Sequence, residues 1–166
     1  VAIFGNFINR VAVLTHKFYE GIVPASNAFS QVDEETLAAI KAYPEVISSS
    51  IERYRFREAQ QELMNLARLG NKYLADQEPW KLQKTDPEAV KQIMFNALNI
   101  NAFLADAFEP FLPDTCNEIR SMLKIDKVFK GFLDGHEIGE GKLLFSKVED
   151  ADVEHQMQKL SKDKPV

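Results

Sequence analysis

The 166 residues are 45% hydrophobic and 27% charged, a composition typical of one soluble globular domain that is large enough for a core of its own. The net charge of −5 argues against a nonspecific nucleic-acid binder, which needs a basic face, although a base-specific site need only be locally neutral. No apolar run approaches a membrane span and no secretory signal is visible, and the single Cys116 cannot form an internal disulfide, which fits the cytoplasm.

The first twenty residues predict an amphipathic helix that ends at Gly21. Its core-facing stripe has three- and four-residue spacing and consists of Phe4, Phe7, Ile8, Val11, Leu14 and Phe18. On another face, Asn6 and Arg10 are one turn apart, so an amide lies beside a guanidinium. The simpler interpretation of this pair is an ordinary solvated face. His16, on the same helix, is more simply a surface residue than a ligand.

A loop is predicted for residues 22–32, which contain Pro24, Ser26, Asn27 and Ser30. Asp33 is predicted to cap the next helix, because the acids that follow it suit the first turn. Pro44 is predicted to interrupt or kink that helix.

From Glu45 the helical period resumes and continues as one long stripe towards Trp80. Arg53, Arg55 and Arg57 alternate within it. On a helix this spacing spreads side chains around the cylinder, so we expect solvated or salt-bridged arginines and not one patch.

The only tryptophan, Trp80, follows Glu78-Pro79 at the exit of this helix. The proline removes a backbone donor and disfavours the helical conformation of Glu78, so the helix should stop here. A tryptophan in this position is either a wedge that seals the end of a bundle or an exposed platform on which a nucleobase stacks.

Asp86-Pro87-Glu88 predicts the start of a broadly apolar helix at the centre of the bundle, with Pro110 at its end. Pro113 opens a further helix that carries Cys116, which is predicted to be a small buried apolar residue.

The fold class predicted is therefore an all-α helix bundle with an extended carboxy-terminal arm. Residues 1–166 form one domain, divided into a bundle (1–123), an arm anchored by its aromatic residues (124–148), and a terminal helix with the start of a linker (149–166). Because the chain starts without methionine and ends on Lys-Asp-Lys-Pro-Val, we expect a fragment of a longer protein.

Catalytic and metal-binding patterns are missing from the sequence. It contains no Cys/His cluster for zinc and no Ser-His-Asp or Cys-His set, and Asp152 with His155 is too little for a metal site. From the residues alone, the sequence supports an all-α bundle in which Trp80 is either core, as in a helical protein-interaction scaffold, or part of an exposed recognition face. A stand-alone enzyme has the least support.

Four motifs together resemble the anticodon-binding domain of methionyl-tRNA synthetases over residues 1–160. They are Gly5-Asn6-Phe7-Ile8-Asn9-Arg10, Phe56-Arg57-Glu58-Ala59, Gly70-Asn71-Lys72-Tyr73-Leu74 with Glu78-Pro79-Trp80, and Leu143-Leu144-Phe145. Related helical domains occur in other synthetases, but Pro-Trp after this helix together with the early Asn-x-x-x-Arg points to methionine.

The resemblance implies that Asn6 and Arg10 read the wobble cytosine of a CAU anticodon while Trp80 stacks on the same base. It carries over more weakly to Asn71, Lys17 and His16. Stacking tolerates any base, so the amide and the guanidinium would supply the base identity.

The resemblance also implies a parent enzyme that attaches methionine to its tRNA. The catalytic signatures of that enzyme are absent here, so this chain is expected to be inactive alone and to need no cofactor. ATP, with a structural zinc ion as an option, belongs to the parent's catalytic domain. The expected partners are the tRNA-Met anticodon loop and that catalytic domain, with a homodimer as an option through a module that is not in this chain, and no membrane.

Overall fold

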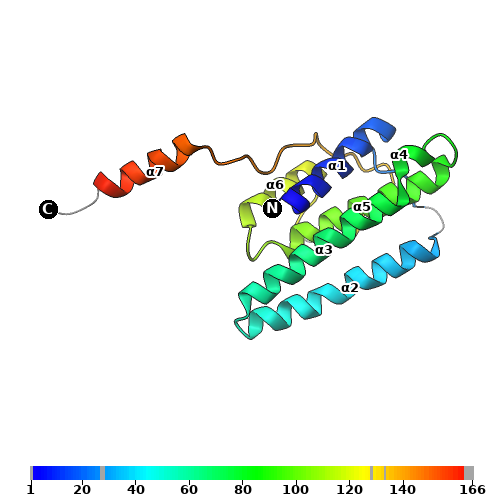
Figure 1. Ribbon diagram of the computed structural model, residues 1–166. Helices are drawn as coiled ribbons and strands as arrows, with labels where there is room; N and C mark the ends of the chain where they lie inside the picture. Colours follow the sequence, from blue (N-terminus) through cyan, green and yellow to red (C-terminus); the bar gives the residue numbers. More distant parts are fainter. Residues whose placement is uncertain (1, 27–28, 128, 133, 163–166) are drawn as a thin grey trace.

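Helices make up the regular secondary structure of the computed structural model, which describes residues 2–26, 29–127, 129–132 and 134–162 (Figure 1). In chain order they are α1 (Ala2–Tyr19), α2 (Gln31–Glu52), α3 (Phe56–Gln77), α4 (Pro79–Leu82), α5 (Pro87–Ala107), α6 (Pro113–Leu123) and α7 (Asp150–Lys162). Within these residues the β-type pairing is limited to one isolated antiparallel bridge, between Ile22 and Glu137. The prediction of an all-α fold is confirmed.

The first six helices form a bundle, and α7 projects away from it at the end of an extended segment (Figure 1). Helix α5 is the centre, because apolar side chains cover most of its surface and α1, α2, α3, α4 and α6 all contact it. Helix α2 lies along α3. None of the helices in the described ranges combines the length and hydrophobicity that crossing a membrane requires.

The capping signals in the sequence mark several helix ends correctly. Helix α1 is followed by Gly21, whose φ of 83° is the left-handed conformation that glycine adopts without strain. At the start of α5, the Asp86 side chain accepts a hydrogen bond from the Ala89 amide at 3.0 Å, with Pro87 in the first turn. Pro113 likewise opens α6.

Two predictions made from proline differ from the structure. Helix α2 continues through Pro44 without a break, so the predicted interruption is wrong. Ile40 and Ile47 on either side of it are each 5% exposed, and their burial keeps the helix intact despite the missing amide. Helix α5 ends at Ala107, three residues before Pro110, the position at which the sequence predicts its end.

The predicted cap of α2 is also displaced. The N-terminal cap is Ser30, whose hydroxyl accepts from the Asp33 amide while the Asp33 carboxylate accepts from the Ser30 amide at 2.8 Å. This is a reciprocal capping box with Asp33 in the first turn. Asp33 is 3% exposed, and its other oxygen accepts a hydrogen bond from the Tyr73 hydroxyl at 2.5 Å. The Asp33 carboxylate therefore has two roles. It takes part in the cap, and it accepts a hydrogen bond in the core, which the prediction of a cap does not include.

The long helix predicted from Glu45 to Trp80 is two helices. A tight turn at residues 53–55 separates α2 from α3, and Tyr54 has a φ of 60° there. The amides of Tyr54 and Arg55 donate to Ile51 and Ser50 carbonyls at 2.9 and 2.8 Å, which closes the turn. The turn contains neither glycine nor proline, so it carries no local signal, and the packing of α2 on α3 decides the fold back.

After α6 the chain is extended and lies against α1 and α6. Its backbone pairs with the loop after α1, where the Val23 amide donates to the His136 carbonyl at 2.7 Å and the Ile138 amide donates to Gly21 at 2.8 Å. Phe132 and Ile138 are 7% and 1% exposed, so apolar anchors hold the segment as well.

A buried polar chain connects α2, α3 and α5. Besides donating to Asp33, the Tyr73 hydroxyl accepts from the Asn96 amide at 3.0 Å, and Asn96 accepts from Gln92 at 2.9 Å. Burial, followed by the hydrogen bond to Asp33, raises the pKa of Tyr73 well above its ordinary range. The Tyr73 hydroxyl therefore stays protonated and remains a donor to the carboxylate.

Replacing Tyr73 by Phe should lower the free energy of unfolding by about 1–3 kcal/mol, because Asp33 and Asn96 would each lose a buried partner. Urea denaturation measures the change. The matched control is Tyr43→Phe, also in the bundle, whose hydroxyl makes no hydrogen bond to the described residues. Equal stabilities for the two variants would contradict the role of the Tyr73 hydroxyl.

A second charged cluster joins α5, α6 and the segment that follows. Arg120 is 5% exposed and donates to Asp106 and Glu109 at 2.9 and 2.7 Å, and Lys127 donates to Glu109 at 2.7 Å. The hydrogen bond from Lys127, followed by the one from Arg120, lowers the pKa of Glu109 below its ordinary 4.5.

This cluster should make the fold sensitive to acid. A carboxylate with a lowered pKa stabilises the fold above pH 4.5, and that stabilisation disappears as pH falls through the lower folded-state value. Unfolding measured from pH 7 to pH 3 should show a smaller loss of stability with acid in Glu109→Gln than in the unaltered protein. Glu118→Gln, which removes an exposed carboxylate on the adjacent helix, is the control and should leave the pH profile unchanged.

Candidate nucleic-acid interface

The rotation of α1 about its axis is set by its apolar stripe. Phe4, Phe7, Ile8 and Val11 are each 0% exposed and face α3 and α5. Asn6 and Arg10, on another face, are therefore left exposed at the surface. The two faces predicted from the sequence are those that the structure shows.

Close contact between α1 and α3 fixes their relative position. A Cβ added at Gly70 would lie 2.8 Å from the Phe7 ring, so only glycine lets the two helices approach this closely. The Asn71 amide group donates to the Ile3 carbonyl of α1 and to the Ala67 carbonyl of α3, both at 2.9 Å. The register of α1 on α3 is thus held by packing and by hydrogen bonds.

Trp80 is presented by a sharp change of direction after α3. Glu78 has a φ of 42°, a left-handed residue that ends the helix, and Pro79 then begins the single turn of α4 with its ring buried. The Lys81 amide donates to the Glu78 carbonyl at 2.8 Å, which closes the turn. Trp80 comes directly after the buried proline and is 40% exposed, so its ring is not a fully buried wedge.

Arg10 and Trp80 meet at the surface. The Arg10 guanidinium carbon lies 5.6 Å from the centroid of the Trp80 ring, within the range of a cation–π contact. Glu78, the acid nearest in sequence, forms an ion pair with Lys81 at 2.7 Å. The indole therefore borders a cation, and the charge of its acidic neighbour is compensated.

Asn6 lies one turn before Arg10, at the edge of a cavity and not at the Trp80 ring. Together with Gly5 it lines a cavity of about 320 Å³ whose other wall is the extended segment 143–147. Phe145 approaches so closely that a Cβ on Gly5 would lie 2.8 Å from its ring. The structure thus brings Arg10 to Trp80 directly and places Asn6 on the same helix face, beside the arm.

The weaker sequence candidates have other contacts. His16 Nε2 lies 2.9 Å from the Gly139 carbonyl, which can only accept, so the imidazole donates and pins the extended segment to α1. Asn71 bonds α1 as described, so its amide hydrogens are engaged within the fold. Lys17 is exposed, and its ammonium lies 5.9 Å from the Phe18 ring, whereas the cation over Trp80 is Arg10. Segment 143–147 beside Asn6 was not predicted, because no local pattern encodes that long-range contact.

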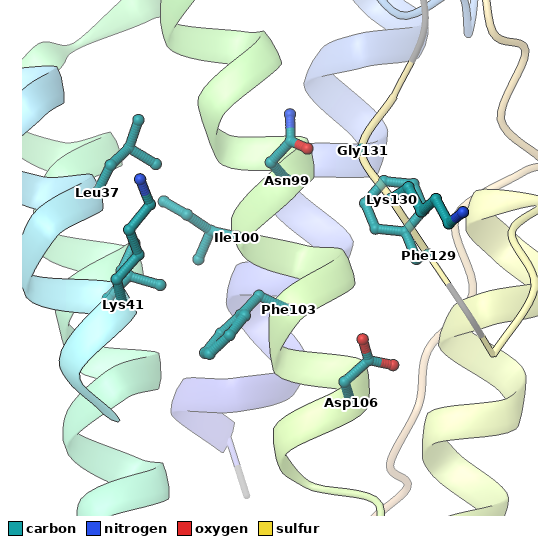
Figure 2. A pocket seen from close by; sticks show the side chains of 10 residues that line it. Leu37, Lys41, Asn99, Ile100, Phe103, Asp106, Phe129, Lys130 and Gly131 are labelled. Atoms are coloured by element: carbon teal, nitrogen blue, oxygen red, sulfur yellow. The ribbon is translucent and has the colours of Figure 1, made fainter. Parts of the chain in front are cut away.

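The pocket in Figure 2 is separate from this surface and contains none of the predicted site residues. It has a volume of about 270 Å³ and lies between α2, α5 and the extended segment, with apolar walls that include Leu37, Phe103 and Phe129. Its carboxylate, Asp106, is already paired with Arg120. It therefore lacks the set of convergent polar groups that marks a catalytic site.

Neither metal binding nor thiol chemistry has structural support in the described part of the chain. No group of three or more His, Cys, Asp or Glu side chains converges there. Cys116 is buried, as predicted, and burial raises the pKa of its thiol to about 11, so it is protonated at neutral pH. The exposed polar and aromatic surface around Arg10 and Trp80 is the stronger candidate.

Comparison with known proteins identifies the family of the chain. The family model described as the anticodon binding domain of methionyl tRNA ligase matches residues 23–164, which includes Trp80 and leaves Asn6 and Arg10 outside. A methionine–tRNA ligase of Flavobacterium psychrophilum is 59% identical over 98% of this chain, and one of Christiangramia forsetii is 57% identical over 99%. The chain spans about a quarter of the length of these relatives, 25% and 26% respectively.

Solved structures show the same fold. The apo form of Mycobacterium tuberculosis methionyl-tRNA synthetase superposes with a TM-score of 0.83 over 90% of this chain and 32% of its own, at 19% sequence identity. Its complex with methionyl-adenylate gives a TM-score of 0.82 over 87% of this chain and 31% of its own, again at 19% identity. At this identity the likeness establishes the fold only. Together with the family match, it leads to the conclusion that this chain belongs to the family of anticodon-binding domains of methionyl-tRNA ligases.

Proposed function

We propose that this chain reads the CAU anticodon of tRNA-Met as the RNA-binding part of an ATP-dependent methionine–tRNA ligase. The observation that carries the proposal is the Arg10 guanidinium 5.6 Å from the centre of a 40% exposed Trp80 ring. Asn6 lies on the same face of α1, one turn before Arg10, and is exposed as well. A scaffold that used Trp80 as core would not need this arrangement.

The chemistry of the three side chains suits an unstacked base. Anticodon loops display bases that are free to stack on an aromatic ring, and the exposed part of the Trp80 indole offers one. Stacking on an aromatic contributes about 1–3 kcal/mol per base and tolerates any base. Trp80 therefore supplies affinity, and identity has to come from contacts to the base edge.

A guanidinium and an amide distinguish cytosine from uracil by their donors and acceptors. Arg10 only donates, so it matches the carbonyl oxygen and the ring nitrogen that cytosine offers as acceptors. In uracil that ring nitrogen carries a hydrogen and would oppose the guanidinium. The Asn6 amide both donates and accepts, so it can pair with the exocyclic amine of cytosine. Contacts of this kind discriminate between bases by about 1–3 kcal/mol.

Packing within the bundle supports the backbone that carries the site residues. The buried stripe of α1 and the contact of Phe7 with Gly70 orient Arg10, while the buried Pro79 orients the turn that carries Trp80. Little backbone order then remains to be created on binding, which preserves affinity. The pairing of Glu78 with Lys81 reduces repulsion of the RNA phosphates by the acid next to the ring.

Replacing Trp80 by Ala should weaken binding of an anticodon stem-loop carrying CAU by about 1–3 kcal/mol, because the stacking surface is lost. The affinity is measured by titration with a fluorescently labelled stem-loop. In the unaltered chain the stem-loop should also quench the intrinsic emission of the sole tryptophan. Trp80→Phe, which keeps a smaller ring, should fall between the two. Unchanged affinity in a folded Trp80→Ala protein would remove the stacking role and favour a scaffold.

Replacing Arg10 by Gln, or Asn6 by Ala, should reduce discrimination between the CAU loop and a loop altered at the wobble base. The affinity for the altered loop should change less. The quantity measured is the free-energy difference between binding of the CAU loop and binding of a loop changed only at the wobble base, obtained from the two dissociation constants, and each substitution should lower it by about 1–3 kcal/mol. Lys17→Gln is the matched control, since it removes one positive charge from the same helix away from Trp80. A ratio that stays the same in both site variants, with Trp80 still quenched, would assign the base reading to other residues.

A further inference from the structure

The α2–α3 turn concentrates positive charge on an otherwise acidic chain. Arg53 caps α2, Arg55 precedes α3 and Arg57 lies in its first turn, and all three are exposed. The prediction that these arginines are solvated or salt-bridged is confirmed, but the predicted continuous helix is wrong: the fold back at residues 53–55 places all three residues at one tip. The chain as a whole carries a net charge of −5, so this tip is locally of opposite sign.

Two of these arginines are free to bind an external anion. Arg55 is 3.6 Å from the Glu58 carboxylate, in an exposed pair. Arg53 and Arg57 form no side-chain ion pair or hydrogen bond with any described residue. A guanidinium group that has no carboxylate partner within the protein can bind a phosphate, to whose oxygens it donates two parallel hydrogen bonds.

The same tip exposes two aromatic rings. Tyr54 is 82% exposed and Phe56 is 49% exposed, with ring centroids 6.3 Å apart and planes at 85°. Tyr54 occupies the left-handed region at a φ of 60°, where glycine or asparagine would be less strained. The residues that follow α1, α3 and α6 adopt the same left-handed conformation, so at Tyr54 it ends α2, and it is the exposure of the two large rings that points to an external contact.

We propose that this tip, Arg53-Tyr54-Arg55-Phe56-Arg57, is a second RNA contact, which binds the phosphate backbone of the tRNA beyond the anticodon loop. The inference rests on the proposed function, because it needs the same RNA to be held at Trp80. Helix α3 has 22 residues and joins the two sites, so at 1.5 Å per residue they lie about 33 Å apart. A contact at that distance reaches the helical body of the RNA and not the anticodon bases.

The charge pattern favours RNA over a protein surface as the occupant. Alternating arginine and aromatic residues suit a phosphate backbone with its sugars, and the side chains of two of the cations have no partner among the described residues. The contact is sequence-independent, since phosphates are the same at every position. It therefore adds affinity and salt sensitivity without altering the choice of anticodon.

The test compares two triple variants of the 166-residue chain on full-length tRNA-Met and on its isolated anticodon stem-loop. Arg53→Gln/Arg55→Gln/Arg57→Gln should weaken binding of the full tRNA by about fivefold or more, and should reduce the slope of log affinity against log salt by about two to three. Its loss on the short stem-loop should be smaller. Discrimination at the wobble base should stay unchanged. The matched control is Lys41→Gln/Lys124→Gln/Lys130→Gln, which removes three exposed charges elsewhere and should leave the slope nearly intact.

A single substitution separates the aromatic contribution from charge. Tyr54→Asn keeps a residue that tolerates the left-handed conformation, so the turn should fold at least as well. It should weaken binding of the full tRNA while leaving the salt slope unchanged, because no charge is removed.

The outcomes distinguish this inference from the proposed function. If the unaltered chain discriminates the wobble base but the arginine triple variant binds full tRNA with the same affinity and slope, the tip inference is overturned and the anticodon site stands. The tip inference is likewise overturned by a second result, obtained with the arginine triple variant in a chain that includes the catalytic domain. That result is weaker association between the two domains with unchanged affinity for tRNA. If the unaltered chain shows no discrimination, the proposed function fails, and the inference that rests on it fails too.

Discussion

The contact of α1 with α3 is the constraint on which the rest of the surface depends. Gly70 lets the Phe7 ring pack against the α3 backbone, and Asn71 adds two hydrogen bonds across and along the helices. Burying Phe7 and its neighbours fixes the rotation of α1 about its axis. Asn6 and Arg10, which lie on another face of the helix, must then be at the surface. The position of the guanidinium over the indole is thus a consequence of core packing.

Charge is distributed so that an acidic chain can present positive groups at particular places on its surface. Arg10 lies against Trp80, and Lys81 compensates Glu78 beside it. Elsewhere, buried cations serve the fold, as Arg120 does by joining α6 to two carboxylates of α5 and the loop after it. The net charge therefore says little about partners here, since what a partner meets is the local balance at one face.

The extended segment after α6 is held against the bundle by contacts along its length. His16 from α1 and backbone pairs near Ile22 hold one stretch, and Phe145 closes on Gly5 further along. Apolar anchors and backbone hydrogen bonds together order a chain that lacks its own regular structure. This is how a segment far along the chain from α1 comes to border Asn6.

The sequence by itself determined the helical class, the buried face of α1, and the ends marked by local chemistry, such as Asp86-Pro87 and Glu78-Pro79. Those signals act within one or two turns, so they survive without knowledge of the fold. It also paired Asn6 with Arg10, because helical spacing makes them neighbours.

Only the tertiary structure decided the rest. It placed the Trp80 ring beside Arg10, folded α2 back onto α3 without a glycine or proline, and gave Asp33 a buried partner, Tyr73, in addition to its part in the capping box. Each of these outcomes depends on which apolar faces meet, and that choice is made by contacts between residues far apart in the chain. Local pattern encodes how a segment folds, whereas packing decides what the segment meets.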